Sequence, residues 1–105
     1  MAIVHVLQGL ARGAEVWIAI HKDCIWLGRD PESDILIPDP NASRMAARIT
    51  RVHDRFCLEY LGSDRQPFSL NGNRVAPRKP VDLKHGDRIA YTTFVASFLV
   101  SISPG

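Results

Sequence analysis

Apolar and polar residues alternate with a period of two along most of this chain, a pattern typical of half-buried β-strands. Val16, Ile18 and Ile20, for example, share one face of a predicted strand, while Trp17 lies on the other face. No stretch has the period of about 3.6 residues expected of an amphipathic helix. The pattern predicts strands over residues 2–7, 15–20, 25–27, 35–37, 46–50, 56–60, 87–91 and 94–102.

Short turn signals separate these strands. The dipeptide Asn71-Gly72, between Leu70 and Val75, is the strongest of them, because it favours the two-residue turn of a β-hairpin. A second hairpin turn is expected at His53. About ten or eleven short strands with turns between them predict an all-β fold, a β-sandwich of two sheets.

Strand alternation also assigns side chains to the two faces of each sheet. Ala47 and Ile49 point to one side of their predicted strand, whereas Ala46 and Arg48 point to the other. In the next strand Cys57 alternates with apolar neighbours, so its side chain is expected to face outward.

Length and composition favour one soluble globular domain. The chain has 105 residues, of which 46% are hydrophobic and 23% charged, so a single domain over residues 1–105 is expected. The net charge of +2 is too small to indicate nucleic-acid binding. No run approaches the about 20 apolar residues needed to cross a membrane, and the N-terminal residues do not form a signal peptide.

Candidate chemistry is sparse. Cys24 and Cys57 lie far apart with no second pair nearby, which argues against a zinc site and favours free thiols. The four histidines are scattered singly and no nucleophile motif accompanies them. The sequence therefore predicts a non-enzymatic protein without catalytic residues, metal or cofactor.

Two motifs place an arginine directly after a small residue, Gly28-Arg29 and Ser43-Arg44. They resemble the Gly-Arg and Ser-Arg-x-His elements of forkhead-associated (FHA) domains, which are β-sandwiches that read phosphothreonine. The resemblance implies a residual phosphopeptide site made of Arg29, Ser43 and Arg44, since guanidinium and hydroxyl groups bind phosphate oxygens well. Arg29 has an alternative role, as the ion-pair partner of an aspartate: Asp30, Asp34 or Asp39.

Two positions depart from the family pattern. Ala46 stands where the family has a histidine that would brace the binding loops. Gln66-Pro67 stands where the family has an Asn-Gly whose asparagine grips the peptide backbone, and proline has no N–H to donate. Asn71-Gly72 matches the family's second Asn-Gly turn instead.

Three longer segments narrow the resemblance: Gly9-Leu10-Ala11-Arg12-Gly13-Ala14-Glu15-Val16, Gly28-Arg29-Asp30-Pro31 and Ser33-Asp34-Ile35-Leu36-Ile37. They are most like the cytoplasmic N-terminal domains of type III secretion inner-membrane ring proteins (the YscD/HrpQ type), which often lack the phosphothreonine residues. This resemblance covers residues 3–102. It implies an interaction scaffold of the basal body, in the bacterial cytoplasm at the face of the inner membrane. It also implies a longer membrane protein whose ring neighbours and cytoplasmic secretion components are the partners.

Six residues are candidates for protein contacts. Trp17 falls on an outward face, where a tryptophan often anchors an interface. Its alternative role is to lie flat over neighbouring side chains at the edge of the sandwich. The other candidates are Trp26, Met45, Arg48, Arg51 and Arg55. Neither nucleic acid nor membrane insertion by this segment is expected.

A second functional hypothesis is a working phosphothreonine reader in a Ser/Thr kinase pathway. The arginines of the two short motifs and their serine favour this hypothesis, because they supply cations and a hydroxyl for a phosphate. Ala46 and Pro67 oppose it, because neither can make the contact of the residue that it replaces.

Overall fold

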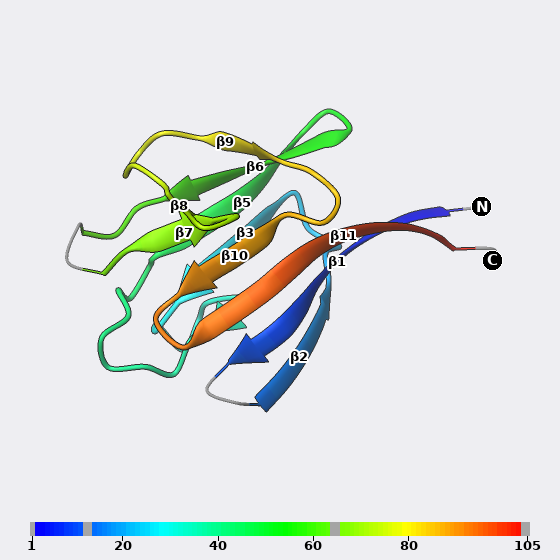
Figure 1. Cartoon of the computed structure of the whole chain (residues 1–105). Coiled ribbons are helices and arrows are strands. Elements are labelled where there is room, and N and C mark those ends of the chain that lie inside the picture. Colours follow the sequence, from blue (N-terminus) through cyan, green and yellow to red (C-terminus); the bar gives the residue numbers. More distant parts are fainter. Residues whose placement is uncertain (1, 12–13, 64–65, 104–105) are drawn as a thin grey trace.

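The computed structural model describes residues 2–11, 14–63 and 66–103, apart from the side chains of residues 2–4, 11, 16 and 101–103. This part of the chain forms eleven β-strands in two facing sheets (Figure 1). The expected all-β sandwich is confirmed. The strands are β1 (Ala2–Ala11), β2 (Ala14–Ala19), β3 (Cys24–Gly28), β4 (Ile35–Leu36), β5 (Ala47–Val52), β6 (Arg55–Tyr60), β7 (Phe68–Leu70), β8 (Asn73–Arg74), β9 (Val81–Leu83), β10 (Arg88–Tyr91) and β11 (Phe94–Ser103).

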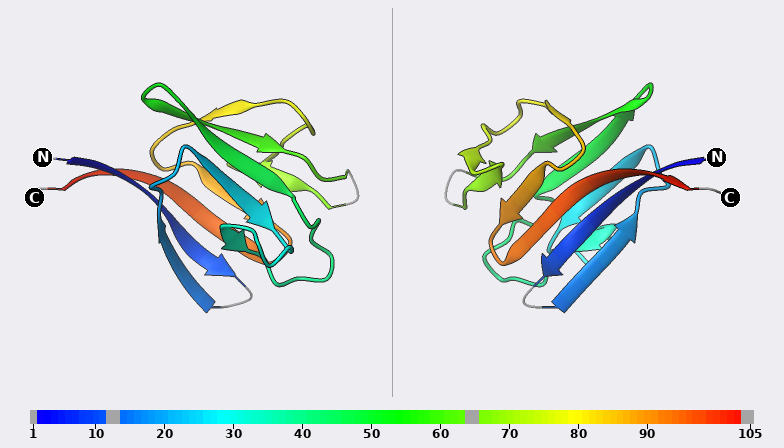
Figure 2. Two further views of the ribbon diagram at one scale, coloured as in Figure 1. Left: turned by 180° about the vertical axis from the view of Figure 1, so that it is seen from behind. Right: turned by 45° about the vertical axis from the view of Figure 1, so that its right-hand side comes forward.

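The two sheets have different strand orders. Six strands form one sheet in the order β2-β1-β11-β10-β7-β8, and five form the other in the order β4-β3-β5-β6-β9. The strand pairs are antiparallel except for β3 and β4, which run parallel. β1 and β11 pair along their full length, from Ala2 opposite Ser103 to Ala11 opposite Phe94. Both termini therefore leave the sandwich at the same end, far from the turn between β10 and β11 (Figure 2).

The core lies between the sheets and is built from the inward faces of the strands. Leu27, Ile49 and Leu58 from one sheet are fully buried, as are Ile89 and Phe94 from the other. Each such side chain stabilises the fold by about 1.5–3 kcal/mol relative to an exposed position. Within the described residues no helix is long and apolar enough to span a membrane.

The hairpin predictions are confirmed by backbone geometry. Asn71 and Gly72 have φ angles of 54° and 81° and connect β7 to β8. Two consecutive left-handed residues are the mark of the tight turn that this dipeptide favours. His53, with a φ angle of 60°, turns the chain from β5 into β6.

The assignment of faces is confirmed at two positions and wrong at a third. Trp17 is 62% exposed, and Cys57 faces away from its buried neighbours in β6. Ala46, predicted to lie on the face opposite Ala47 and Ile49, is fully buried as they are. It precedes β5 rather than belonging to it, so strand alternation does not govern its direction. Of the longer segment around Gly9, Arg12 and Gly13 lie outside the described residues.

Candidate functional site

The two arginine motifs meet at the end of the sandwich opposite the termini. The backbone N–H of Arg29 donates to the carbonyl of Ser43 at 3.0 Å, and that of Asp30 donates to the carbonyl of Arg44 at 3.0 Å. The loop after β3 and the loop before β5 are therefore joined side by side. The sequence prediction that Gly28-Arg29 and Ser43-Arg44 belong to one site agrees with this geometry.

Gly28 allows this close approach of the two loops. A Cβ atom at position 28 would stand 2.1 Å from the carbonyl oxygen of Arg44. No side chain can be accommodated there unless one of the backbones moves. Glycine is required at this position because its backbone lies directly against the backbone of Arg44.

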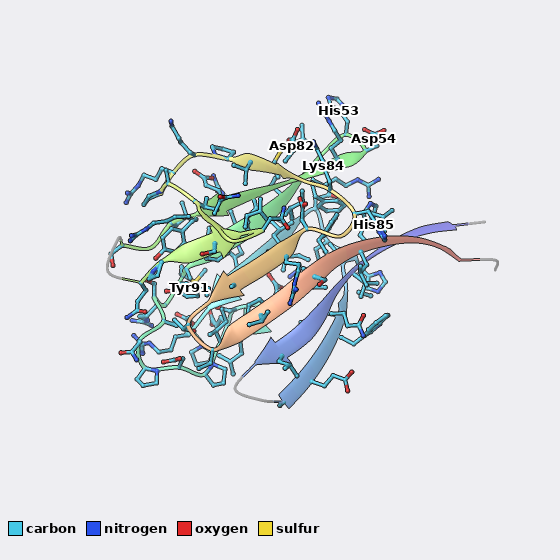
Figure 3. The ribbon with its side chains drawn as sticks, in the orientation of Figure 1. His53, Asp54, Asp82, Lys84, His85 and Tyr91 are labelled. Carbon is cyan, nitrogen blue, oxygen red and sulfur yellow. The ribbon has the colours of Figure 1, made fainter. Side chains whose placement is uncertain are left out.

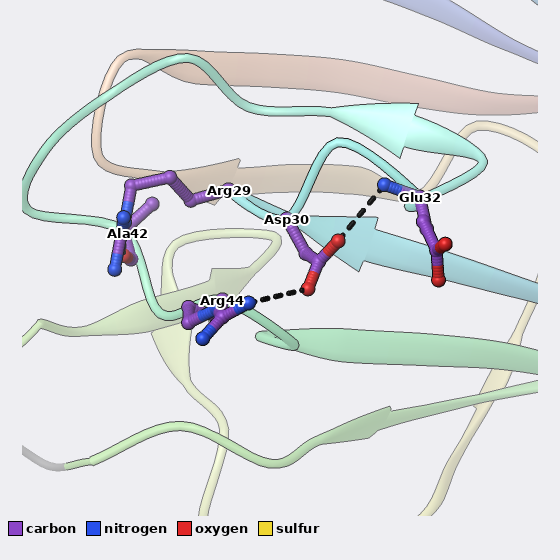
Figure 4. A network of polar contacts seen from close by, with 5 residues as sticks. All are labelled: Arg29, Asp30, Glu32, Ala42 and Arg44. Carbon is purple, nitrogen blue, oxygen red and sulfur yellow. Dashed lines mark hydrogen bonds and ion pairs between the residues drawn. The ribbon is translucent and has the colours of Figure 1, made fainter.

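Arg29 is an exposed residue whose side chain extends toward Ala42 (Figure 4). Its Nε donates to the Ala42 carbonyl at 3.1 Å. Within the described part of the chain, Arg29 forms no ion pair with Asp30, Asp34 or Asp39. The alternative reading of Arg29 as an ion-pair partner is thus wrong, although its charge still contributes to lowering the pKa of Asp30. Its terminal amino groups remain available for an anion.

Arg44, the second cation, is engaged within the chain. Its Nη2 lies 3.1 Å from Oδ2 of Asp30, whose other oxygen accepts the backbone N–H of Glu32 at 2.9 Å (Figure 4). The pKa of Asp30 is lowered, first by the Glu32 N–H and then by the Arg44 guanidinium. Because Arg44 is 70% exposed, this ion pair contributes little to stability. It does reduce the positive charge offered to a ligand.

The loop that carries Ser43 is held by hydroxyl groups from the opposite sheet. Ser43 donates its backbone N–H to the Tyr91 hydroxyl at 2.8 Å. Asp39, which is buried, accepts the backbone N–H of Asn41 and the hydroxyl of Thr93. Tyr91 and Thr93 come from β10 and the turn after it, so this turn fixes the loop. The sequence analysis did not identify these residues.

Ala46 lies below this loop and packs in the core. Its N–H donates to the carbonyl of Leu27 at 2.8 Å, and its carbonyl accepts the N–H of Leu61 at 2.7 Å. Position 46 is fully buried, so a larger polar side chain there would have to displace its neighbours. The loop is held by the Tyr91 hydroxyl, since the methyl group of Ala46 offers no hydrogen bond.

A second tyrosine holds the loop that contains Gln66. The Tyr60 hydroxyl lies 2.7 Å from the Ser63 carbonyl and 2.8 Å from the Gln66 carbonyl. The rings of Tyr60 and Tyr91 pack against each other and against Phe68, with centroids 5.0–5.6 Å apart. One buried aromatic cluster thus fixes two of the loops at this end. Two inward-facing tyrosines at strand ends are the signal from which the sequence analysis could have found it.

The Asn71 side chain forms hydrogen bonds within the fold. Its Nδ2 donates to Oδ1 of Asp87 at 2.9 Å, and its Oδ1 accepts the backbone N–H of Arg88 at 2.9 Å. The side chain therefore ties the β7–β8 turn to the start of β10. The prediction that Asn71-Gly72 forms a turn is consistent with these bonds.

The six predicted contact residues do not form one surface. Trp17 lies on the six-stranded sheet, whereas the Arg48 guanidinium covers Trp26 on the five-stranded sheet at 5.8 Å and pairs with Glu59. Met45 is 39% exposed in the loop next to Arg44. Arg51 and Arg55 lie near the opposite end of the sandwich. Arg48 and Arg51 therefore lie on different faces of β5.

The thiols and acids of the described residues do not assemble a metal site. No group of three or more His, Cys, Asp or Glu side chains in this part of the chain could hold an ion. Cys24 and Cys57 are free, and Thr50 of the intervening strand lies between them. The strand between them keeps these two thiols from pairing with each other.

Comparison with known proteins agrees with the fold. The FHA domain family profile matches residues 25–91, which is more than half of the chain. Among curated proteins, none matches the chain in a sequence search.

Three solved structures illustrate the likeness. The FHA domain of the CT664 protein from Chlamydia trachomatis is 21% identical, with a TM-score of 0.80 over 95% of this chain and 99% of that one. Mycobacterium tuberculosis EmbR, in complex with a low-affinity phosphopeptide, is 24% identical, with a TM-score of 0.81 over 97% of this chain and 26% of that one. The yeast Dun1 FHA domain, in complex with a doubly phosphorylated peptide, is 24% identical, with a TM-score of 0.72 over 97% and 79%.

Proposed function

The chain belongs to the FHA domain family, and from this premise we propose that it is an interaction scaffold of a type III secretion inner-membrane ring protein. FHA domains are protein-interaction modules rather than enzymes. The proposed partners are neighbouring ring subunits and cytoplasmic components of the secretion apparatus, at the cytoplasmic face of the inner membrane. The sequence pattern around Gly9, Gly28 and Ser33 supports this assignment within the family.

One observation carries the scaffold proposal: the phosphate site is incomplete. The Arg44 guanidinium is paired with Asp30, and Gln66-Pro67 replaces the Asn-Gly that would hold a peptide backbone. A phosphopeptide would therefore meet one uncommitted guanidinium, that of Arg29, instead of a complete set of donors. Contacts that do not depend on phosphothreonine are favoured, and Trp17 is the exposed aromatic side chain best suited to one.

A second candidate function is phosphothreonine recognition in Ser/Thr kinase signalling. The observation that favours it is the Tyr91 hydroxyl, which holds the Ser43 backbone and keeps the loop ordered without the histidine. Arg29 and Ser43 are then presented on adjoining backbones at one end of the sandwich. Charge-assisted hydrogen bonds from these groups would each contribute about 1.5–3 kcal/mol.

A titration of the isotopically labelled chain separates the two functions. Phosphothreonine peptides and their unphosphorylated counterparts are added in parallel, and the backbone amide shifts are followed. The scaffold proposal expects no phosphate-dependent shifts at millimolar peptide. Shifts that cluster at Gly28-Arg29 and Ser43-Arg44, and that Arg29→Ala removes, would establish the reader and overturn the scaffold proposal.

The partner surface has a separate test in the full-length protein. Trp17→Ala is expected to weaken at least one pairwise contact of the assembly, because a large exposed aromatic anchor is lost. Val95→Ala, which removes a smaller exposed side chain from the same sheet, is the matched control. Co-purification from cells provides the measurement. If every pairwise contact survives Trp17→Ala, Trp17 is not an anchor.

A further inference from the structure

A cavity of about 280 Å³ opens between the two sheets at the end where the termini leave. Figure 3 places His53, Asp54 and His85 near this end, and Tyr91 beside the loops of the opposite end. The walls of the cavity include inward-facing residues of β1, β5, β6 and β11, namely His5, Arg51, Phe56, Phe98 and Val100. This cavity is separate from Arg29, Ser43 and Arg44 and has no role in the function proposed above.

The inner wall of the cavity is aromatic and apolar. The His5 ring packs against Phe56 with centroids 4.6 Å apart, and against Phe98 with centroids 5.8 Å apart. Phe56 and Phe98 also meet edge to face at 5.9 Å. Leu83 completes this wall. Aromatic faces at this spacing can pack against one further planar ring.

The rim of the cavity is cationic. The Arg51 guanidinium lies 5.9 Å from the centre of the Phe56 ring, and its Nε donates to the His53 carbonyl at 2.8 Å. Within the described residues it forms no ion pair, although Asp54 also lines the cavity. Arg55 reaches Asp82 only at 3.7 Å, with both side chains at least half exposed.

The electrostatics of the rim favour an anion. Burial, and secondly the positive charge of Arg51, lower the pKa of His5 from its usual value. The imidazole is therefore neutral at pH 7, and Arg51 provides a fixed cation whose terminal amino groups have no acidic partner in the described part of the chain. A bound carboxylate would accept hydrogen bonds from those groups in two-pronged geometry.

We propose that this cavity binds a small aromatic carboxylate, with its ring on Phe56 and Phe98 and its carboxylate on Arg51. The volume lies at the lower end of the about 300–1,000 Å³ typical of ligand sites, so it fits one ring and one anionic group. Nucleotides and peptides are too large for it. The ligand class follows from an aromatic wall beside a guanidinium that has no acidic partner among the described residues.

The test uses phenylacetate as the probe and neutral phenylacetamide as its control, each titrated into the labelled chain. Phenylacetate is expected to shift the ring signals of His5, Phe56 and Phe98 and the Nε–H signal of Arg51, with saturation in the millimolar range. Phenylacetamide is expected to bind at least about tenfold more weakly, because it lacks the charge that Arg51 recognises.

Two variants of the same strand provide the matched comparison. Arg51→Gln is expected to weaken phenylacetate binding about tenfold, whereas Arg48→Gln, on the outer face of β5, leaves it unchanged. Thermal melting of both variants confirms that each is folded. If Arg51→Gln unfolds the chain, Arg55→Gln is measured in its place, with a smaller loss expected.

Three results would overturn the proposal. These are equal affinity for the acid and the amide, absence of shifts at millimolar phenylacetate, and shifts confined to Arg29 and Arg44. The last result would place the anion in the loops of the opposite end. The phosphopeptide titration is judged by shifts at those loops and the phenylacetate titration by shifts at the cavity, so failure of one proposal can be told apart from failure of the other.

Discussion

Tyr91 braces the loop of the candidate site from the opposite sheet. Its oxygen accepts the backbone N–H of Ser43, while Ala46 lies buried below the loop. The sequence shows an alanine at position 46, but strand alternation cannot show which side chain holds the Ser43 loop. Tyr91 lies 48 residues away from Ser43 along the chain.

Tyr91→Phe is expected to destabilise the protein by about 1 kcal/mol, because it leaves the Ser43 N–H without its acceptor. Hydrogen exchange of the Ser43 amide should accelerate by more than this global loss explains. Tyr60→Phe is the matched control, since its hydroxyl holds the Ser63 and Gln66 carbonyls of a different loop. Unchanged exchange at Ser43 in Tyr91→Phe would show that the hydroxyl does not brace the loop.

Ala46→His, which restores the family residue, is expected to destabilise the fold by about 1–3 kcal/mol or more and to leave phosphopeptide affinity unimproved. The position is fully buried, and the larger ring would force its neighbours apart. Met45→His, at the exposed neighbouring position, should be nearly neutral in stability. Chemical denaturation measures both variants, and an Ala46→His variant as stable as the parent would contradict this account.

The strands and turns of this fold use glycine for two different physical reasons. At Gly28 the backbone of the next loop leaves no space for a side chain. At Gly72 nothing lies within 4 Å of an added Cβ atom, but the φ angle of 81° is unfavourable for other residues. Both glycines belong to sequence motifs, but only Gly28 lies where two segments of the chain are in contact.

Gly28→Ala should therefore cost more than Gly72→Ala. The first is expected to destabilise by about 3 kcal/mol or more, because the Arg44 carbonyl oxygen occupies the site of the methyl group. The second should cost about 1–2 kcal/mol, which is the penalty of a left-handed residue. Equilibrium unfolding in urea gives both values. Equal losses would mean that the loops of the candidate site do not pack as closely as described.

At the scale of the whole molecule, two carboxylates make stability depend on acid pH. The pKa of Asp34 is lowered, first by its hydrogen bond from Lys22 and next by the backbone N–H of Trp26. The pKa of Asp30 is lowered chiefly by the Glu32 N–H. Groups with a lowered pKa stabilise the folded state above their unfolded pKa of about 3.9, and this contribution disappears as the pH falls through the folded values.

The unfolding free energy is therefore expected to fall below about pH 4, and Asp34→Asn should flatten that dependence. Asp54→Asn, at the exposed turn after β5, changes the charge by the same amount and is the control. Thermal melting from about pH 2.5 to about pH 7 measures how the stability of each variant changes with pH. If Asp34→Asn retains the full slope, the Lys22 and Trp26 contacts do not hold this carboxylate in solution.

Local patterning predicted much of the fold. The alternation of apolar residues and the turns at His53 and Asn71 recur in the structure, and Trp17 and Cys57 face outward as expected. These features depend on residues next to one another in the chain. Arg48 and Arg51 project from opposite faces of the same strand, as strand alternation requires of residues three apart.

The sequence by itself determined the strands, the turns and the residue types available at the arginine motifs, because these follow from backbone preference and the period-two pattern. Only the tertiary structure decided which charges are free. Arg44 is paired with Asp30, whereas Arg29 and Arg51 end beside backbone carbonyls. The pairing of charges and the burial of Ala46 depend on contacts between loops that are far apart in the sequence. The alternation of apolar and polar residues within one strand does not specify such contacts.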